Sequence, residues 1–500
     1  MDVALLLDHC RRCGVYPHVK TGELAYRAAK GAMTEEIASA IQTRKKDILR
    51  YLTNLEESRF HITSASADRA PLFNRFLWKD YSKRIMEVSG ANAPHIVMRR
   101  TGEMLTDSLL KSIKLLLERH DVLNSSIEIV GENLHLVCRT AKTPAFNEVI
   151  IDGKTVGDNE CEAYRIANNL VWEEYDLDNG PLYRVFLVRL STFEYILGVA
   201  LHHAIGDLIS IGLMFQELLS IYSSVVHCTP LRLSPTRLRY MDYLSSIESW
   251  SACAACEEHL RYWKDKLRST PVTGLSAKET LPLGCVSPES VGETKLLLDA
   301  AVSSDLKKIA VRLKTTLFAV LLSIYKIAIW RMTEQEEPVV IALHAGRLDA
   351  GFQNAIGDFA LETAYKTCLS GNPGFTETTR RVMHTINEAN LHQPIPLDWV
   401  RRAFTEEGVS FCAPGINFIS VDVGHTQNRL EPRRLYFTPP GVRHGCHGFS
   451  VSCALELRVG GGIIEGSMVY RNDLYDEPTV HEFMDCFTQT ATDAIRFPEK

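Results

Sequence analysis

The sequence predicts a protein of the mixed α+β or α/β class, in which a small αββαα unit precedes a much larger region. Three observations lead to this prediction. An apolar run at 195–201 ends in polar residues and is followed by apolar residues at helical spacing, which is typical of a strand, a tight loop and a helix. A strongly periodic helix at 316–330 precedes a second buried strand at 339–343. Residues 1–53 show a helix, a hairpin and two short helices.

The prediction of the small αββαα unit depends on the pattern within residues 1–53. Apolar residues at helical spacing open it, and two strand-like stretches, 15–19 and 23–27, flank a turn that contains Gly22. Residues 33–52 then supply two short helices. A hairpin at the end of so small a unit offers an unpaired strand edge, which can accept the tail of another chain by strand addition.

The charge of this unit indicates the kind of partner it suits. Basic side chains outnumber acidic ones by nine to six within residues 1–53, whereas the whole chain carries a net charge of -6. A basic module suits an acidic peptide, because opposite charges steer the two together. A solvated surface without a partner is the alternative. The polar residues at 54–70 are predicted to be a linker.

Two histidines and a carboxylate occupy the loop after the strand at 195–201. His202 and His203 follow the strand, and Asp207 lies four residues after His203, just before the helix. A single histidine in such a place is usually a core residue, but two beside a carboxylate are a candidate catalytic site. Histidine is the commonest general base near neutral pH, because its unperturbed pKa is about 6.5. The second histidine is expected to project from the strand end while the acid braces the loop.

Composition restricts the class of protein. Its 500 residues predict about two to four domains, and 45% hydrophobic with 23% charged residues is ordinary for a globular protein without nucleic-acid partners. The opening, MDVALLLDHCRRC, places an acid before its apolar run and arginines after it, which is the reverse of a secretory signal. The apolar run at 317–330 is interrupted by Lys326 and is too short to span a bilayer. We therefore expect a cytoplasmic protein without membrane partners.

The cysteines do not predict a metal site. Thirteen cysteines, an odd number in a chain without an export signal, indicate reduced thiols. Zinc requires about four converging ligands, and the candidate groups are small and far apart in the sequence. They are Cys10 with Cys13, Cys253 with Cys256, and His444 with Cys446 and His447.

The HHxxxD pattern at 202–207 resembles the HHxxxDG core motif of nonribosomal peptide synthetase condensation domains, within the chloramphenicol acetyltransferase-like superfamily. Leu208 stands where that family has glycine, which leaves an unusual acceptor or weakened catalysis open. Residues 1–54 are similar to the TubC-type N-terminal docking domain, with Ala29 in place of the usual proline. Further stretches are similar to family motifs and follow in the family's order. They are 71–80 (with Arg75 and Trp78 kept and Asn74 for glutamine), 109–127, 173–190, 240–250, 259–267, 339–347, 356–367, 390–400 and the hairpin at 449–476.

The resemblance implies a domain organisation for the whole chain. A docking domain at 1–54 and a linker at 55–70 precede a first lobe at 71–228 and a second lobe at 229–500. The two lobes are expected to form a V, each a mixed sheet with flanking helices. The docking surface for the C-terminal tail of an upstream synthase is expected to include Lys20, Tyr26, Arg27 and Lys30.

The resemblance also implies a role for each residue of the histidine loop, which is expected at the floor of a tunnel between the lobes. His203 is expected to face the acceptor and to take its proton or hydrogen-bond it. His202 points away and supports the loop. Asp207 braces the loop by pairing with Arg347, and Gly206 supports the site as well.

The resemblance implies an acyltransferase that joins a carrier-bound acyl or peptidyl thioester to an amine, forming an amide. Donor and acceptor carrier proteins would present their substrates on phosphopantetheine arms, and no other cofactor is expected. An ester-forming reaction with a hydroxyl acceptor and a non-catalytic docking scaffold are the alternatives. Heterocyclisation is disfavoured, because that subfamily replaces both histidines with aspartates. A free-standing protein and a piece of a longer synthetase are both compatible with the ending at Lys500.

Overall fold

The structure is a computed structural model of the chain. It describes residues 15–20, 22–28, 33–57, 68–71, 94–130, 133–139, 143–151, 156–268, 274–275, 291–347, 349–392, 395–407, 413–420, 453–460, 462–472 and 474–499, with positions 3, 6, 7 and 10. Some sequence predictions lie outside these residues. They are the ones that concern Cys13, Ala29, Lys30, Asn74, Arg75, Trp78, His444, Cys446 and His447.

The N-terminal unit has the predicted hairpin and helices. Strands β1 (Val15–Lys20) and β2 (Glu23–Ala28) pair antiparallel around Gly22, whose positive φ of 78° suits glycine in a tight turn. Helix α2 (Glu35–Thr43) and helix α3 (Lys45–Glu57) follow. The unit has a hydrophobic core of its own, formed by Leu6, Leu7, Cys10, Val15, Ile37, Ile41, Ile48 and Leu52.

The first lobe is built on a four-stranded sheet in the order β4-β9-β8-β7. Its strands are β4 (His95–Thr101), β9 (Glu194–Leu201), β8 (Tyr183–Arg189) and β7 (Phe146–Ile150). Only the β7–β8 pairing is parallel. Helices cover both faces of the sheet, and they are α5 (Thr106–Arg119), α6 (Val156–Trp172) and α7 (Leu208–His227).

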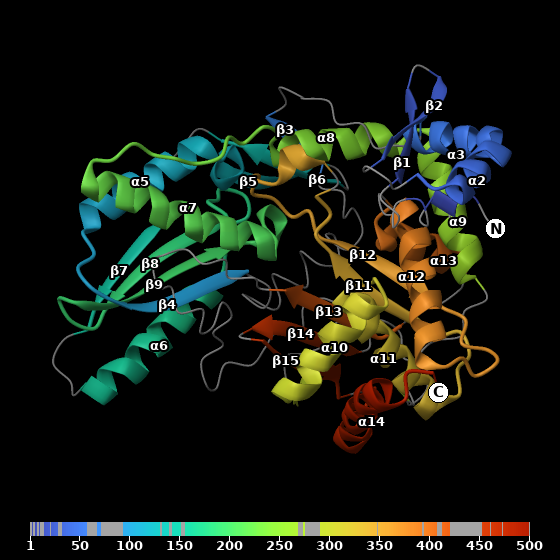
Figure 1. Cartoon of the computed structure of the whole chain (residues 1–500). Coiled ribbons are helices and arrows are strands. Elements are labelled where there is room, and N and C mark those ends of the chain that lie inside the picture. The colour runs from blue at the N-terminus through green and yellow to red at the C-terminus, as the bar shows by residue number, and fades with distance from the viewer. Residues whose placement is uncertain are drawn as a thin grey trace.

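Alternation along β8 separates the two faces of this sheet. Val185 and Leu187 belong to the core shared with α5 and α7, whereas Phe186 and Val188 pack with α6 residues such as Ala167. Successive strand residues point to opposite faces. The sheet is therefore buried on both sides, and β9 reads as the continuous apolar run that the sequence shows (Figure 1).

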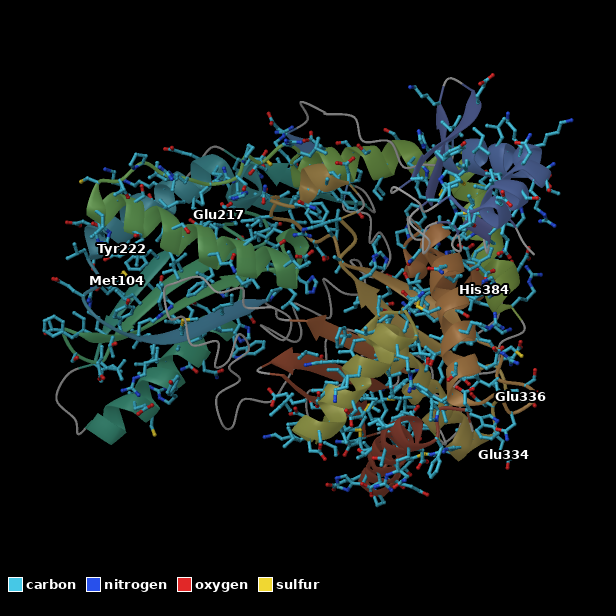
Figure 2. The ribbon with its side chains drawn as sticks, viewed as in Figure 1. Met104, Glu217, Tyr222, Glu334, Glu336 and His384 are labelled. Atoms are coloured by element: carbon cyan, nitrogen blue, oxygen red, sulfur yellow. The ribbon has the colours of Figure 1, made fainter. Side chains whose placement is uncertain are left out.

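Helix α7 is held to α5 by buried polar contacts as well as by apolar packing. Glu217 of α7, labelled in Figure 2, accepts a hydrogen bond from Arg119 Nε at 2.8 Å and lies 2.7 Å from His120 Nε2. Tyr222, one turn further along, accepts a hydrogen bond from the backbone nitrogen of Leu105 at 2.8 Å. By length and composition α7 could cross a membrane, but in this fold it packs within the core of the first lobe.

The second lobe is built on a six-stranded mixed sheet in the order β10-β15-β14-β13-β11-β12. Its strands are β10 (Val291–Leu298), β15 (Ile463–Arg471), β14 (Cys453–Gly460), β13 (Gly415–Ser420), β11 (Val339–His344) and β12 (Leu361–Lys366). The helices of this lobe are α9 (Ala254–Leu267), α10 (Ala300–Arg312), α11 (Leu317–Thr333), α12 (Phe375–Leu391), α13 (Leu397–Glu406) and α14 (Glu477–Arg496).

The two lobes share packing at their junction. Helix α8 (Tyr240–Ser251) runs along the top of Figure 1 between the lobes. Its Tyr240 and Tyr243 pack in the core of the first lobe, whereas its Trp250 packs in the core of the second. Tyr243 contacts the rings of Phe352 and Phe359, which precede β12, at centroid distances of 5.7 and 5.0 Å. A segment that belongs to the second lobe by sequence therefore completes the core of the first.

The described elements also include a small three-stranded sheet and two short helical turns outside the histidine loop. The sheet has the order β3-β6-β5, from strands β3 (Arg69–Pro71), β6 (Asn133–Cys138) and β5 (Ser125–Val130). The 3-10 turns η1 (Asp121–Asn124) and η4 (Ala350–Phe352) precede β5 and β12. Helix α3 ends at Glu57 and β3 begins at Arg69, so regular structure enters both ends of the stretch predicted as a linker.

Candidate active site

The histidine loop connects the centre of the first-lobe sheet to α7. His202 continues the line of β9 by donating its backbone N–H to Leu182 O at 2.7 Å, and the chain then forms the single 3-10 turn η2 (His203–Ile205). At Gly206 the backbone passes so close to Leu201 that an added Cβ would lie 2.4 Å from its Cδ1. The loop is thus packed directly onto the strand that precedes it.

Asp207 closes the loop by capping α7. Its Oδ1 accepts the backbone N–H of Ser210 at 2.8 Å, which satisfies one of the free N–H groups at the helix start. The same carboxylate forms an ion pair with Arg347, with Nη1–Oδ2 and Nη2–Oδ1 distances of 2.9 and 3.3 Å. Both side chains are almost fully buried. The cap of α7 and the end of β11 are therefore joined through one carboxylate.

Arg347 is held by more than the carboxylate. Its Nη2 also donates to Ser210 Oγ at 3.0 Å and to Ala355 O at 3.2 Å, and its guanidinium lies 4.4 Å from the centre of the Phe359 ring. A delocalised guanidinium suits such a site, because its planar fork pairs with a carboxylate while its face stacks on an aromatic ring. The arrangement ties the second lobe to the histidine loop.

His203 is in contact with a carboxylate that the sequence reasoning missed. Its Nδ1 lies 3.2 Å from Asp358 Oδ2, and 30% of the His203 side chain is exposed, compared with 11% for Asp358. Burial lowers the pKa of His203, but the charge and hydrogen bond of Asp358 outweigh it and raise the pKa to about 9. Burial also raises the pKa of Asp358. Both shifts favour the protonated form of the group, so the pair of His203 and Asp358 retains a proton through neutral pH.

His202 has a different environment from its neighbour. Its side chain is buried, its Nδ1 accepts the backbone N–H of Ala204 at 3.2 Å, and its ring meets Tyr175 edge to face at 5.5 Å. Burial and the nearby His203 lower the pKa of His202 to about 3. A neutral, buried imidazole that accepts a loop N–H serves the conformation of the loop.

Leu208 is the first residue of α7 and packs partly against the first-lobe core. Its backbone is helical, so this position does not require glycine to adopt an unusual angle. An unusual acceptor or weakened catalysis as a consequence of Leu208 remains a prediction.

The remaining predicted site residues lie in the N-terminal unit. Lys20 ends β1 and is exposed, and 55% of Tyr26 on β2 is exposed. Arg27 is also on β2, but its side chain, like all of Lys30, lies outside the described residues.

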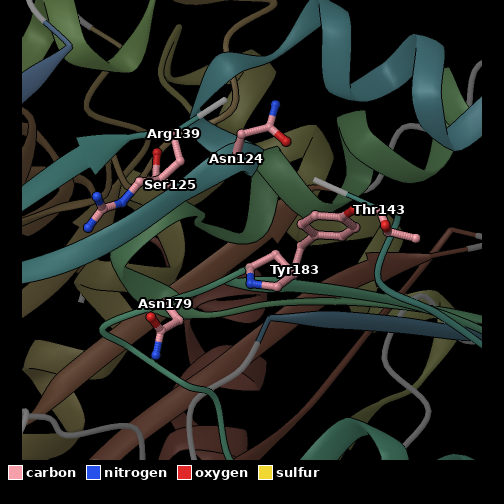
Figure 3. Close-up of a pocket in the computed structure, with 7 residues that line it drawn as sticks. Asn124, Ser125, Arg139, Thr143, Asn179 and Tyr183 are labelled. Carbon is pink, nitrogen blue, oxygen red and sulfur yellow. The ribbon is translucent and has the colours of Figure 1, made fainter. Parts of the chain in front are cut away.

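Figure 3 shows a pocket in the first lobe. It encloses about 270 Å³, counting space open to solvent, and none of the predicted catalytic residues lines it. Its lining residues are Asn124, Ser125, Arg139, Thr143, Asn179, Pro181 and Tyr183. Among the residues that the structure describes, no group of three or more histidine, cysteine or acidic side chains is placed to hold a metal ion.

Asp358 could have been suspected from its surroundings in the sequence. It is the one charged residue in the stretch from Ile356 to Phe359, where both of those apolar neighbours are buried. A carboxylate in such a stretch needs a partner. The sequence does not identify that partner, because His203 lies 155 residues away.

Two mixed sheets, joined across a histidine loop, define the chloramphenicol acetyltransferase-like fold of condensation domains. The condensation-domain family model matches residues 86–500, and the model of the TubC N-terminal docking domain matches residues 3–54. The chain therefore belongs to the condensation-domain family of nonribosomal peptide synthetases and carries a TubC-type docking domain at its N-terminus. The family and the fold predicted from the sequence are confirmed.

Curated relatives are large synthetases. A linear gramicidin synthase from Brevibacillus parabrevis is 29% identical over 308 residues, which are 61% of this chain and 6% of the relative. Malpinin synthetase of Mortierella alpina is 24% identical over 432 residues, which are 86% of this chain and 6% of the relative. The chain thus spans only a small part of the length of these relatives.

Solved structures agree with the fold. The X-domain from teicoplanin biosynthesis has a TM-score of 0.72 at 18% identity, covering 88% of this chain and 98% of that one. The cyclization-docking bidomain of EpoB from Sorangium cellulosum has a TM-score of 0.68 at 17% identity, covering 100% and 99%.

Proposed function

We propose that the chain joins a donor acyl or peptidyl thioester to an amine acceptor and so forms an amide. Donor and acceptor are proposed to arrive on the phosphopantetheine arms of two carrier proteins. Membership of the condensation-domain family supports this reaction. The observation that carries the proposal for this chain is His203, a partly exposed imidazole on a loop that is locked to both lobes.

The reaction requires one proton transfer. The acceptor nitrogen attacks the thioester carbonyl, a C–N bond forms and the C–S bond breaks. His203 Nε2 takes the proton from the attacking nitrogen and passes it to the sulfur of the donor arm, which leaves as a thiol. Holding two tethered substrates together is worth up to roughly 7 to 11 kcal/mol, so the base needs to contribute only about a factor of 10² to 10⁴.

The other loop residues are proposed to hold His203 in place. His202 and Gly206 set the path of the loop, and the Asp207–Arg347 pair fixes the start of α7. Leu208 is proposed to narrow the space beside the acceptor, because it replaces a residue without a side chain.

The N-terminal unit is proposed to bind the C-terminal tail of an upstream synthase by strand addition. Among the described residues, β1 and β2 form a sheet of two strands, and Lys20 and Tyr26 are exposed on them. An acidic tail suits the basic unit. We place this reaction in the cytoplasm, where synthases and carrier proteins would meet it.

A hydroxyl acceptor is a second candidate, and the contact between His203 and Asp358 favours it. A hydroxyl is a weaker nucleophile than an amine and depends more on a base that a carboxylate supports. Supplying matched amine and hydroxyl acceptors on the same carrier and comparing the products by mass spectrometry distinguishes an amide from an ester.

Replacing His203 with alanine tests the proposed function. We expect His203→Ala to lower condensation between loaded carriers by about 10² to 10⁴, the usual contribution of a general base, and to leave the fold intact because the ring is partly exposed. Product is measured by mass spectrometry and folding by circular dichroism. His227→Ala, at the exposed end of α7, is the control and should keep full turnover. Wild-type turnover by His203→Ala would sink the assignment, and no turnover by the wild type with any loaded carrier would favour a docking scaffold.

A further inference from the structure

We propose that Asp358 is a positioning residue for His203, which holds the imidazole by Nδ1 so that Nε2 faces the acceptor nucleophile. This inference rests on the proposed role of His203 as a base. Asp358 itself makes no contact with the reacting atoms in this proposal. It acts on the reaction only through the imidazole.

The backbone on both sides of Asp358 is fixed to the start of α7. Gly357 N donates to Ser210 Oγ at 3.1 Å, and Ser210 Oγ donates to Gly357 O at 2.7 Å. On the other side, Phe359 N donates to Asp207 Oδ2 at 3.1 Å. The carboxylate of Asp358 is therefore held between two anchored neighbours, and it does not reach His203 by chance rotation of an exposed side chain.

Close packing leaves this turn little freedom to move. An added Cβ on Gly357 would lie 2.3 Å from Cδ2 of Tyr240, which is itself buried. The ring of Phe359 is buried against Arg347 and α8. A site whose supporting residues are packed in this way can hold a side chain to the few tenths of an ångström that proton transfer requires.

The charges around His203 leave Asp358 as its direct partner. Asp207 is already paired with Arg347, and His202 is neutral because burial lowers its pKa to about 3. Tyr240 and Tyr243 face Asp358 from α8, and burial raises the pKa of each phenol, so neither carries charge near neutral pH. Asp358 is accordingly the main charge that raises the pKa of His203 to about 9, and Asp207 adds a smaller effect in the same direction.

The contact determines which ring nitrogen can accept a proton. When His203 is neutral, the carboxylate of Asp358 accepts Nδ1–H and leaves the lone pair of Nε2 free for the acceptor. When Nε2 has taken the proton, the same carboxylate stabilises the imidazolium. An aspartate beside histidine plays this double role in hydrolytic triads. In Asp358→Asn, the amide N–H of the new side chain can donate to Nδ1 instead. The neutral imidazole would then carry its proton on Nε2, so Nε2 could not accept the proton of the nucleophile.

The pH profile of Asp358→Asn tests this inference. The active form of His203 is neutral, so the wild-type rate should rise with pH until the pH passes about 9. Loss of the carboxylate removes the effect that raises this pKa, and the rising limb should move down by about 1 to 3 pH units. The rate above the limb should fall by about 10² to 10⁴. An acceptor amine also titrates, near about 8, but it does so equally in both proteins.

Two variants control for damage to the fold. Asp242→Asn removes a buried carboxylate of α8 that pairs with Arg239 and not with His203, and its limb should stay in place. Asp358→Glu keeps the charge, so it should keep the limb near the wild-type position even where its rate is lower. An unmoved limb in Asp358→Asn, or an equal shift in Asp242→Asn, would overturn the positioning role.

NMR titration supplies a readout that does not depend on turnover. Protein labelled at its 17 histidines shows the His203 signal by comparison with His203→Gln. We expect the His203 signal to titrate near pH 9 in the wild type and at a lower pH in Asp358→Asn. Titration at the same pH in both proteins would contradict the inference even if the enzyme is active. Absent turnover with a shifted titration would instead contradict only the proposed function.

Discussion

At the scale of single residues, Asp207 combines two tasks that the loop needs. One oxygen caps α7 through Ser210, and the carboxylate also neutralises Arg347 in a buried place. Removing one partner of a buried pair leaves the other charge without compensation, which costs far more than losing an exposed pair. Stability and site geometry therefore depend on the same side chain.

Asp207→Ala should lower the free energy of unfolding by about 3 to 5 kcal/mol, because Arg347 keeps its charge in a buried place. Urea denaturation followed by tryptophan fluorescence measures the change. Glu162→Ala removes an ion pair with Arg165 on α6, whose arginine side chain is 61% exposed, and should cost less than about 1 kcal/mol. Equal losses in the two variants would show that the buried pair contributes nothing beyond an ordinary surface contact.

The residues of the site were predictable to different extents. The sequence places His202, His203 and Asp207 in one loop, since their spacing follows a strand and precedes a helix. Arg347 was reached only through the resemblance to a family. Asp358 was missed, because its contact with His203 depends on how a segment 155 residues away packs across the junction of the lobes.

At the scale of secondary structure, two glycines near the start of α7 are in opposite situations. Gly206 lies before the helix, where an added Cβ would meet Leu201 of β9. Gly212 lies within the helix, where an added Cβ would meet nothing within 4 Å. The first glycine is required by close packing, whereas the second only increases the conformational freedom of the unfolded chain.

We expect Gly212→Ala to raise the free energy of unfolding by about 0.5 to 1 kcal/mol, because alanine favours the helix and meets no neighbour. Gly206→Ala should lower it by about 1 to 3 kcal/mol, because the side chain of Leu201 is buried and has little room to yield. Chemical denaturation of both variants measures the two effects. A gain in stability from Gly206→Ala would contradict the close approach of the loop to β9.

At the scale of the whole molecule, element types were predicted better than their arrangement. Apolar periodicity correctly predicted β9, α7, α11 and β11, since each has a continuous or strongly periodic apolar pattern. The sheet order of the second lobe places β13 beside both β11 and β14. Strand order of this kind depends on contacts between distant segments, which periodicity does not record.

The packing of second-lobe residues in the core of the first lobe could likewise not be predicted from the sequence pattern. The aromatic rings of Tyr243, Phe352 and Phe359 read as apolar residues of the second lobe, but they pack in the core of the first. The boundary between the two lobes after residue 228 therefore remains a prediction. The packing shows in addition that the lobes are tied together at their junction.

The separate core of the N-terminal unit leads to a prediction about how partners are brought to the site. Because this unit has its own hydrophobic core, changes at its strand edge should alter docking and leave chemistry unchanged. With an upstream carrier that bears its natural C-terminal tail, Lys20→Glu together with Tyr26→Ala should raise KM for that carrier about tenfold, which corresponds to about 1.4 kcal/mol of binding. Turnover at saturating carrier should stay at the wild-type value.

Lys46→Glu makes the same charge change on the exposed side of α3 and should leave KM within about twofold. An equal rise in KM for Lys46→Glu would indicate that overall charge, rather than the strand edge, attracts the tail, and an unchanged KM in both variants would contradict docking through this hairpin.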